Sequence, residues 1–411
     1  MHFLYNIGIF LYGLMMRIVS PFHPKAKQWV DGRADFFSSL PNVADKEVYW
    51  FHCASLGEFD QGLPVINLIK QRFPSKFILV TFFSPSGFLH YHKRDHKADY
   101  VCYLPLDTPS NARKFIKHFN PEKAFFVKYE FWANFIFQAK KNNTKIYSIC
   151  AIFRPEQIYF KRKNSFFISI LKAFDFFFVQ NKSSAQLLET IGIKAYEISG
   201  DTRFDRVIEN KNSVQANIQI EGFLKNEKAF IVGSSWPVDE DLIIPFINED
   251  TIKAPVIIAP HDVSEKHILQ ICEKITVPFI KYSELNRVVT TGNEKVLILD
   301  SIGQLASAYF YGSHAYIGGG FTGSLHNILE PAVFGLPVIF GPKHSRFPEA
   351  EMFISKGIGF SIQNKDEFAS ILTKIEASKF ELTAKIIEVV AFNAGASEKI
   401  IDKLLKIQNI K

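Results

Sequence analysis

Two series of short apolar segments, each alternating with stretches of helical periodicity, constrain the fold more than any other feature. The pattern runs over residues 48–179, pauses near 200–205, and resumes over 230–340. The runs that read as strands are 48–52, 77–81, 100–104, 123–127, 145–149, 176–179, 230–233, 256–259, 277–280, 296–299, 315–317 and 337–340. Apolar strands that alternate with helices are typical of parallel sheets buried on both faces. The sequence therefore predicts an α/β protein with two Rossmann-like, doubly wound domains facing a cleft, joined by a linker within 204–223.

The size and composition of the chain agree with two well-filled cores. A chain of 411 residues with 47% hydrophobic content is too long for one ordinary core. We interpret the 42 phenylalanines as aromatic core volume together with compositional drift toward Phe, Ile, Lys and Asn.

The net charge and the cysteine pattern limit which partners and which kinds of site the protein can have. The net charge of +7 permits an acidic substrate or an anionic membrane surface. Zinc-finger spacing and long Lys/Arg blocks are absent from the sequence, so nucleic acid is not an expected partner. Cys53, Cys102, Cys150 and Cys272 form no C-x-x-C pair, which argues against a disulfide framework or zinc site and fits a reducing cytoplasm.

Residues 3–22 form an apolar segment interrupted by Asn6 and Arg17 and followed by Lys25 and Lys27. A signal peptide is disfavoured because a positive n-region and a small-residue cleavage site are not evident. A charge at position 17 makes a spanning helix marginal. We expect a helix lying in or dipping into the cytoplasmic leaflet, with the cations near the headgroups. A buried first helix of the globular domain is the alternative.

Polar residues directly after the predicted strands are the candidates for function, because ligands bind at the carboxyl ends of strands in doubly wound sheets. Glu58 follows the first strand at a predicted helix start. A carboxylate kept ionised by the helix end can act there as a general base toward a hydroxyl. The alternative is a glutamate that only complements the helix dipole. Further candidate residues at strand ends are Ser86, Glu130, Trp132, Arg154, Ser234, Ser235, Pro260 and His261.

A glycine-rich stretch at 318–342 holds six of the 22 glycines, which let the backbone turn and approach a ligand. Ser324 and Asn327 are predicted N-caps of a short helix that holds His326, Asn327 and Glu330. A strand, a glycine-rich turn and a helix N-terminus together predict an anion site. The alternative is a tight connection without a ligand, and the GGGFTG order is not the Rossmann fingerprint.

Several motifs occur in one order along nearly the whole chain. They are His52, Ser55, Gly57 and Glu58, then 130–134, 200–205, 233–235 and 318–320, then His326, Asn327, Glu330 and Pro331. This ordered set resembles the 3-deoxy-D-manno-octulosonic acid (Kdo) transferases of lipid A assembly, and it is far more specific than any single motif.

The resemblance implies an inverting GT-B glycosyltransferase that moves Kdo from CMP-Kdo to a lipid A precursor, lipid IVA, without a bound metal or cofactor. It implies a location at the cytoplasmic face of the inner membrane, peripheral or held by one N-terminal anchor. The expected parts are a membrane-associating segment 1–30, an acceptor-binding domain 31–210, a CMP-Kdo-binding domain 211–385 and a helix 386–411 that crosses back to the first domain.

The resemblance also implies roles for individual residues. Glu58 matches the general base, and Glu130 matches a second acidic position in the active site. The implied donor-binding residues are Gly233, Ser234, Ser235, Pro260, His261, Gly319, Gly320, Asn327, Glu330 and Lys343. The implied acceptor-binding residues are Ser55, Gly57, Ser86, Trp132 and Arg154.

One departure from the family pattern concerns the donor phosphate. Many relatives have Pro-Arg-His after the second strand of the C-terminal domain, whereas this chain has Pro260-His261-Asp262. Lys343 or Arg346 is a candidate for the missing cation. Two other interpretations stay open: another GT-B nucleotide-sugar enzyme, such as a UDP-sugar transferase or an epimerase-like protein, and an inactive membrane-associated nucleotide-binding module.

Overall fold

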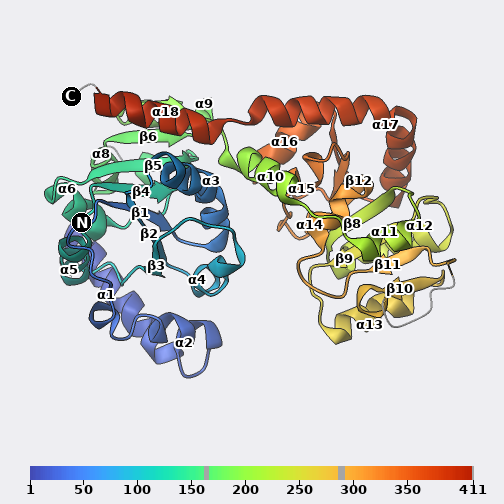
Figure 1. Cartoon of the computed structure of the whole chain (residues 1–411), viewed down its shortest axis with the longest axis horizontal. Helices are drawn as coiled ribbons and strands as arrows, with labels where there is room; N and C mark the ends of the chain where they lie inside the picture. The colour runs from blue at the N-terminus through green and yellow to red at the C-terminus, as the bar shows by residue number, and fades with distance from the viewer. Residues whose placement is uncertain (162–165, 286–291, 410–411) are drawn as a thin grey trace. The chain divides into compact units, whose positions relative to one another are not determined.

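The computed structural model describes residues 1–161, 166–285 and 292–409. The chain divides into two compact units, Met1–Arg206 with Asn393–Lys411, and Val207–Phe392. Each unit contains one parallel seven-stranded sheet covered by helices (Figure 1). The predicted α/β class, with two doubly wound sheets of the GT-B type, is confirmed.

The sheet of the first unit has the strand order β3-β2-β1-β4-β5-β6-β7. Its strands are β1 (Val48–Cys53), β2 (Phe77–Phe82), β3 (Tyr100–Tyr103), β4 (Lys123–Val127), β5 (Lys145–Ala151), β6 (Phe176–Val179) and β7 (Tyr196–Ile198). The helices are α1 (His2–Val19), α2 (Pro24–Asp31), α3 (Leu56–Arg72), α4 (Pro85–His90), α5 (Pro109–Phe119), α6 (Ala133–Lys141), α7 (Ile158–Lys161), α8 (Phe166–Lys172), α9 (Lys182–Thr190), α10 (Thr202–Ser213), which runs across the boundary between the units, and α18 (Ala396–Asn409).

The central strand β1 explains why the strands of this unit read as continuous apolar runs. All six of its residues are buried. Val48 and Trp50 belong to one hydrophobic cluster, and Tyr49, Phe51 and Cys53 belong to another. Because successive side chains of a strand point to opposite faces, each face of this sheet packs against its own core.

The last helix of the chain, α18, completes the core of the first unit. Ile400, Ile401 and Leu404 are buried in the same cluster as Tyr49 and Phe51 of β1, and α18 packs along α3 (Figure 1). Asp205, within the 200–205 motif, accepts hydrogen bonds from the backbone N–H groups of Gly395 (2.5 Å) and Ser397 (2.7 Å). This carboxylate caps the start of α18, a structural role that the motif did not reveal.

The sheet of the second unit has the order β10-β11-β9-β8-β12-β13-β14. Its strands are β8 (Ala229–Ser235), β9 (Val256–Pro260), β10 (Phe279–Lys281), β11 (Val296–Ile298), β12 (Gly312–Ile317), β13 (Val338–Phe340) and β14 (Gly359–Ser361). Its helices are α11 (Ile218–Leu224), α12 (Pro237–Asn248), α13 (Glu265–Lys274), α14 (Leu305–Phe310), α15 (Leu329–Ala332), α16 (Pro348–Ser355) and α17 (Lys365–Asn393), the last with a kink at Ser378. Short 3-10 helical turns lie at Phe36–Ser38 and Tyr91–Lys93 in the first unit and at Tyr282–Glu284 in the second unit.

Some elements differ from the predicted ones. The strands β7 and β14 were not predicted, and the strand predicted at 277–280 begins only at Phe279, after Pro278. The predicted linker region 204–223 is largely helical, because α10 and most of α11 occupy it.

The helix α1 has one face on the first unit and one face exposed. Tyr5, Asn6, Ile9, Tyr12, Gly13 and Met16, which recur at helical spacing along one face, are buried or half-buried. The exposed apolar side chains of the helix are Phe3, Leu4, Ile7, Phe10, Leu11, Leu14, Met15, Ile18 and Val19. The helix is apolar and long enough to enter a membrane. The alternative of a buried first helix is wrong for this outer face.

Candidate functional site

The first group of polar residues lies where the strand order of the first sheet reverses. The strands β1 and β4 are neighbours in the sheet, and β2 and β5 flank them. Glu58 follows β1, and Glu130 follows β4. In open α/β sheets this reversal leaves a crevice beyond the carboxyl ends of the strands, where ligands bind.

Glu58 is both a helix cap and a perturbed carboxylate. Its backbone N–H donates to Ser55 Oγ (3.4 Å), and its Oε2 accepts from the Ser55 N–H (3.1 Å), which forms a capping box at the start of α3. The side chain is only 8% exposed. Burial, and then the negative charge of Glu130, raises the pKa of Glu58 to about 7. A carboxylate with this pKa can accept a proton at neutral pH.

The electrostatic environment of Glu58 contains a second acid and a cation. Glu130 is half-buried, and burial raises the pKa of its carboxyl group. Lys128 lowers the pKa of Glu58, and burial together with Arg203 lowers the pKa of Lys128 itself. Lys128 has a positive φ of 64°, which directs the chain sharply out of β4 just before Glu130.

A chain of hydrogen bonds holds Trp132, which lies two residues after Glu130. Trp132 Nε1 donates to His52 Nε2 (3.1 Å), so the proton of the neutral His52 ring resides on Nδ1, which donates to Thr81 Oγ1 (3.0 Å). Burial lowers the pKa of His52 to about 3, which keeps the ring neutral. The Trp132 ring also packs on Phe83, with centroids 4.4 Å apart. His52 is therefore a support for Trp132.

The other predicted acceptor residues follow the same group of neighbouring strands. Ser55 and Gly57 are at the start of α3, Ser86 is exposed in α4 after β2, and Arg154 follows β5. A Cβ atom built on Gly57 would meet no atom within 4 Å, so the first turn of α3 faces open space beside Glu58.

The glycine-rich loop lies at the corresponding reversal in the second sheet, where β8 and β12 are neighbours. A Cβ atom on Gly318 would lie 2.1 Å from the Ser234 carbonyl oxygen, and one on Gly320 would lie 2.4 Å from the Gly341 nitrogen. Gly319 has a φ of 88°. These positions require glycine because backbone packs directly on backbone. The loop thus joins the ends of three strands, β8, β12 and β13.

Asp239, which sequence reasoning missed, fixes this loop. Its Oδ2 accepts from the N–H groups of Gly319 (3.1 Å) and Trp236 (2.9 Å), and its Oδ1 accepts from Tyr316 OH (2.6 Å). The carboxylate is fully buried, and burial raises its pKa. No local pattern marks this residue, because the bonds to Tyr316 and Gly319 span about 80 positions.

The helix after the glycine loop is shorter than predicted. The one-turn helix α15 begins at Leu329, so His326 and Asn327 precede it, and Ser324 does not cap it. Asn327 Oδ1 instead accepts from the Leu329 N–H (3.1 Å), while its Nδ2 donates to Glu330 Oε1 (3.2 Å). Asn327 and Glu330, both predicted site residues, are therefore in direct contact. The first N–H group of α15 is bound by the Asn327 side chain.

Aromatic rings converge at the ends of β8 and β9. Trp236 and His261 are stacked with centroids 4.4 Å apart, and His326 lies 4.7 Å from His261. Burial, and then the neighbouring His261, lowers the pKa of His326 to about 4. Ser235 Oγ donates to the buried Glu240 (2.9 Å), and Pro260 pairs with Ser235 in the sheet.

Lys343 is exposed, and its backbone N–H donates to the Gly320 carbonyl (2.7 Å). Arg346 is also exposed, three residues further on. The contact places Lys343 next to the glycine loop, as the hypothesis of a replacement cation requires.

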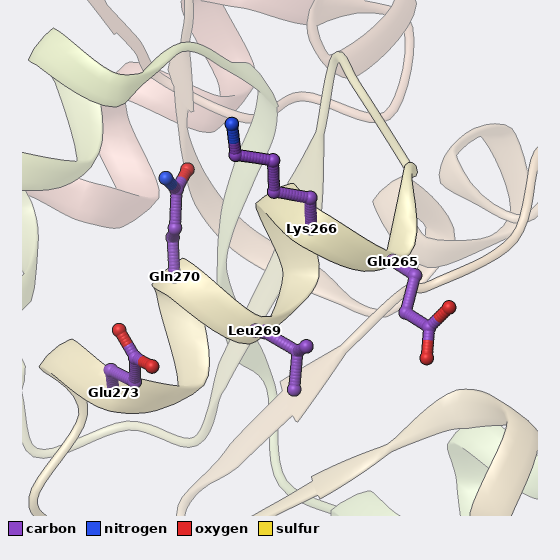
Figure 2. Close-up of a pocket in the computed structure, with 5 residues that line it drawn as sticks. All are labelled: Glu265, Lys266, Leu269, Gln270 and Glu273. Carbon is purple, nitrogen blue, oxygen red and sulfur yellow. The ribbon is translucent and has the colours of Figure 1, made fainter.

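A hollow of about 460 Å³ on the second unit contains none of the predicted site residues (Figure 2). It is lined by Glu265, Lys266, Leu269, Gln270 and Glu273, all from α13. Figure 2 shows Lys266 and Gln270 pointing to one side of the helix and Glu265 and Leu269 pointing to the other. Because ligand sites need convergent polar groups, we do not assign a function to this hollow.

Comparison with known proteins agrees with these observations. Residues 30–206 match the family model described as 3-deoxy-D-manno-octulosonic-acid transferase (kdotransferase). A 3-deoxy-D-manno-octulosonic acid transferase of Aquifex aeolicus is 28% identical over 84% of this chain and 90% of that protein. A bifunctional glycosyltransferase/methyltransferase of Fusobacterium nucleatum is 24% identical over 90% of this chain, which spans 59% of that protein. A UDP-GlcNAc 2-epimerase structure from Neisseria meningitidis, 15% identical, has a TM-score of 0.65 and covers 87% of this chain and 99% of that chain.

The fold defines the chain as a GT-B protein, with polar residues at the strand-order reversal of each sheet. Residues 30–206, which include Glu58 and Glu130, match the model of the Kdo transferase family. The resemblance predicted from the motifs is confirmed.

Proposed function

We propose that this protein is an inverting glycosyltransferase that moves Kdo from CMP-Kdo to a hydroxyl group of a lipid A precursor, lipid IVA. The observation that supports this proposal most directly is the buried Glu58, whose pKa is about 7, beside Glu130 in the domain of the Kdo transferase family. The Aquifex aeolicus relative bears the name of this activity.

In the proposed reaction Glu58 is the general base. Its carboxylate takes the proton of the acceptor hydroxyl, whose oxygen then bonds to the anomeric carbon of Kdo. The bond between that carbon and the phosphate oxygen breaks, and its electron pair leaves with CMP. Burial, and then the charge of Glu130, keeps the pKa of Glu58 high enough for the proton to be accepted near neutral pH. Trp132, held by His52 and Phe83, offers a fixed aromatic surface for the acceptor. Ser55, Gly57, Ser86 and Arg154 complete the proposed acceptor site.

The donor would bind at the end of the second sheet, around the glycine loop. Gly233, Ser234, Ser235, Gly319 and Gly320 are the residues in and beside this loop that are proposed to contact the donor. Pro260, His261, Asn327 and Glu330 surround this loop, the last for sugar hydroxyls. The low pKa of His326 leaves that ring neutral at pH 7, so the cation that offsets the leaving phosphate is proposed to be Lys343, with neither a metal nor a cofactor taking part.

We also propose that the protein lies on the cytoplasmic face of the inner membrane. The exposed apolar face of α1 enters the lipid, with Arg17, Lys25 and Lys27 near anionic headgroups. The opposite face is held on the first unit by hydrogen bonds, including Tyr5 OH to Asp107 Oδ2 (2.5 Å). This arrangement favours a helix lying in the interface over one that spans the bilayer.

A panel of nucleotides tests the donor assignment. CMP is expected to raise the melting temperature of the full-length protein in a concentration-dependent manner, while UDP and UDP-N-acetylglucosamine are expected to leave it unchanged. Stabilisation by UDP rather than CMP would favour a UDP-sugar enzyme of the same fold. An absence of any nucleotide effect would favour a protein without this chemistry.

A further inference from the structure

The first backbone N–H groups of α6 are capped by side chains that are distant in sequence. This helix follows the segment that carries Glu130 and Trp132, and its own N-cap residue, Trp132, makes no side-chain cap hydrogen bond. The first N–H groups of a helix need partners from elsewhere in the protein. Three of these groups, those of Ala133, Asn134 and Phe135, receive theirs from side chains distant in sequence.

Asp107 is the main partner of these groups. Its Oδ2 accepts from the Asn134 N–H (3.1 Å), and its Oδ1 accepts from the Phe135 N–H (3.0 Å). The residue is 1% exposed. Burial raises the pKa of this carboxyl group to about 6, while its hydrogen bonds, first the one from Tyr5, oppose that rise. Asp107 therefore carries a negative charge at neutral pH and faces the positive end of α6.

The remaining partner comes from α1. Tyr5 OH donates to Asp107 Oδ2 (2.5 Å) and accepts from the Ala133 N–H (3.3 Å). Asn6 Oδ1 accepts from Asn134 Nδ2 (2.8 Å). The inner face of α1 thus contributes directly to the capping of α6.

The same helix also reaches Trp132 indirectly, through Phe83. Tyr12 lies 6.1 Å from Phe83 between ring centroids, and Phe83 packs on Trp132. The charge of Glu130 contributes to the raised pKa of Tyr12, after burial, which places the two groups in one electrostatic environment. Both ends of the inner face of α1 therefore act on the segment from Glu130 to Trp132.

We propose that α1 is part of the acceptor site, because Tyr5 and Asp107 are positioning residues that fix the start of α6 and with it Glu130 and Trp132. The outer face of α1 meets the lipid, so a single helix connects the membrane surface with the catalytic carboxylates. This inference rests on the proposed function for its account of the acceptor, but the positioning itself is a property of the fold.

The kinetic test uses Tyr5→Phe in detergent micelles, where docking to a bilayer plays no part. Loss of one hydroxyl bound to a carboxylate is expected to raise the KM for the lipid A precursor about tenfold, while the KM for CMP-Kdo stays unchanged. The matched control is Tyr196→Phe, which also removes a tyrosine hydroxyl bound to a carboxylate, that of Glu189, but on the edge strand β7. Wild-type KM values for both substrates in Tyr5→Phe would overturn the proposal.

Hydrogen exchange tests the positioning without any activity. In Tyr5→Phe and Asp107→Asn, the amides of residues 133–135 are expected to exchange faster than in the wild type, and those of α18 are expected to be unaffected. Failure of the wild type to transfer Kdo would refute the proposed function and leave this result standing. Unchanged exchange at 133–135 in both variants, with melting temperatures near that of the wild type, would refute the positioning role alone.

Discussion

The pH dependence of transfer follows from the environment of Glu58. Only the ionised carboxylate can accept the hydroxyl proton, and the pKa of Glu58 is raised to about 7 by burial and by Glu130. Half of the enzyme is therefore active at pH 7 and about one tenth at pH 6, so kcat/KM for the acceptor should fall about fivefold between pH 7 and pH 6 and about tenfold per pH unit below that. A glutamate with the ordinary pKa of 4.5 would keep nearly its full rate down to about pH 6.

The substitution Glu130→Gln separates the two causes of the raised pKa of Glu58, which are burial and the charge of Glu130. It removes the like charge but leaves Glu58 buried, so the acid limb should move to lower pH and still stay above 4.5, because burial is the larger cause. The assay is a pH profile of kcat/KM for the acceptor at saturating CMP-Kdo, measured for both proteins. A wild-type midpoint near 4.5, or a shift to higher pH in Glu130→Gln, would refute this explanation of the acidity of Glu58.

Four further outcomes are expected. Glu58→Gln keeps a side chain that can form the capping box, so turnover should fall about 10²- to 10⁴-fold while calorimetry finds CMP affinity unchanged; near-normal turnover would remove Glu58 as the base. Phe10→Ser, on the outer face of α1, should weaken flotation with anionic liposomes and leave activity in detergent intact, whereas normal flotation would exclude this face as the membrane contact. Ile400→Ala should lower the free energy of unfolding by about 2–5 kcal/mol in urea titrations, and a negligible change would show that α18 does not support the first core. Lys343→Ala should weaken CMP-Kdo binding several-fold in calorimetry, and unchanged affinity would refute its role as the replacement cation.

The central strands could be predicted because their chemistry is local. A strand such as β1, buried on both faces, must be apolar throughout, and that pattern is visible in sequence. The strands β7 and β14 have three residues each, and β7 has no buried residue, so neither leaves a comparable run. The one-turn helix α15 is likewise too short for its boundaries to be predicted.

The strand-end residues of the site could be predicted from the same pattern, but their supports could not. Glu58 and Glu130 follow recognisable strands, so a rule about sheet topology locates them. Asp107 acts on Tyr5 across 102 positions, and Asp239 acts on Gly319 across 80. Such contacts depend on how elements pack and leave no periodicity in the sequence.

The most direct test of the central claim is incubation of the full-length protein with CMP-Kdo and the tetraacylated lipid A precursor, followed by mass spectrometry of the lipid. The proposed function predicts products heavier than the precursor by one or more Kdo residues, with CMP released in the same ratio and with about 10²- to 10⁴-fold slower formation by Glu58→Gln. An unchanged lipid mass under conditions in which CMP stabilises the protein, or transfer from a UDP-sugar in place of CMP-Kdo, would contradict it.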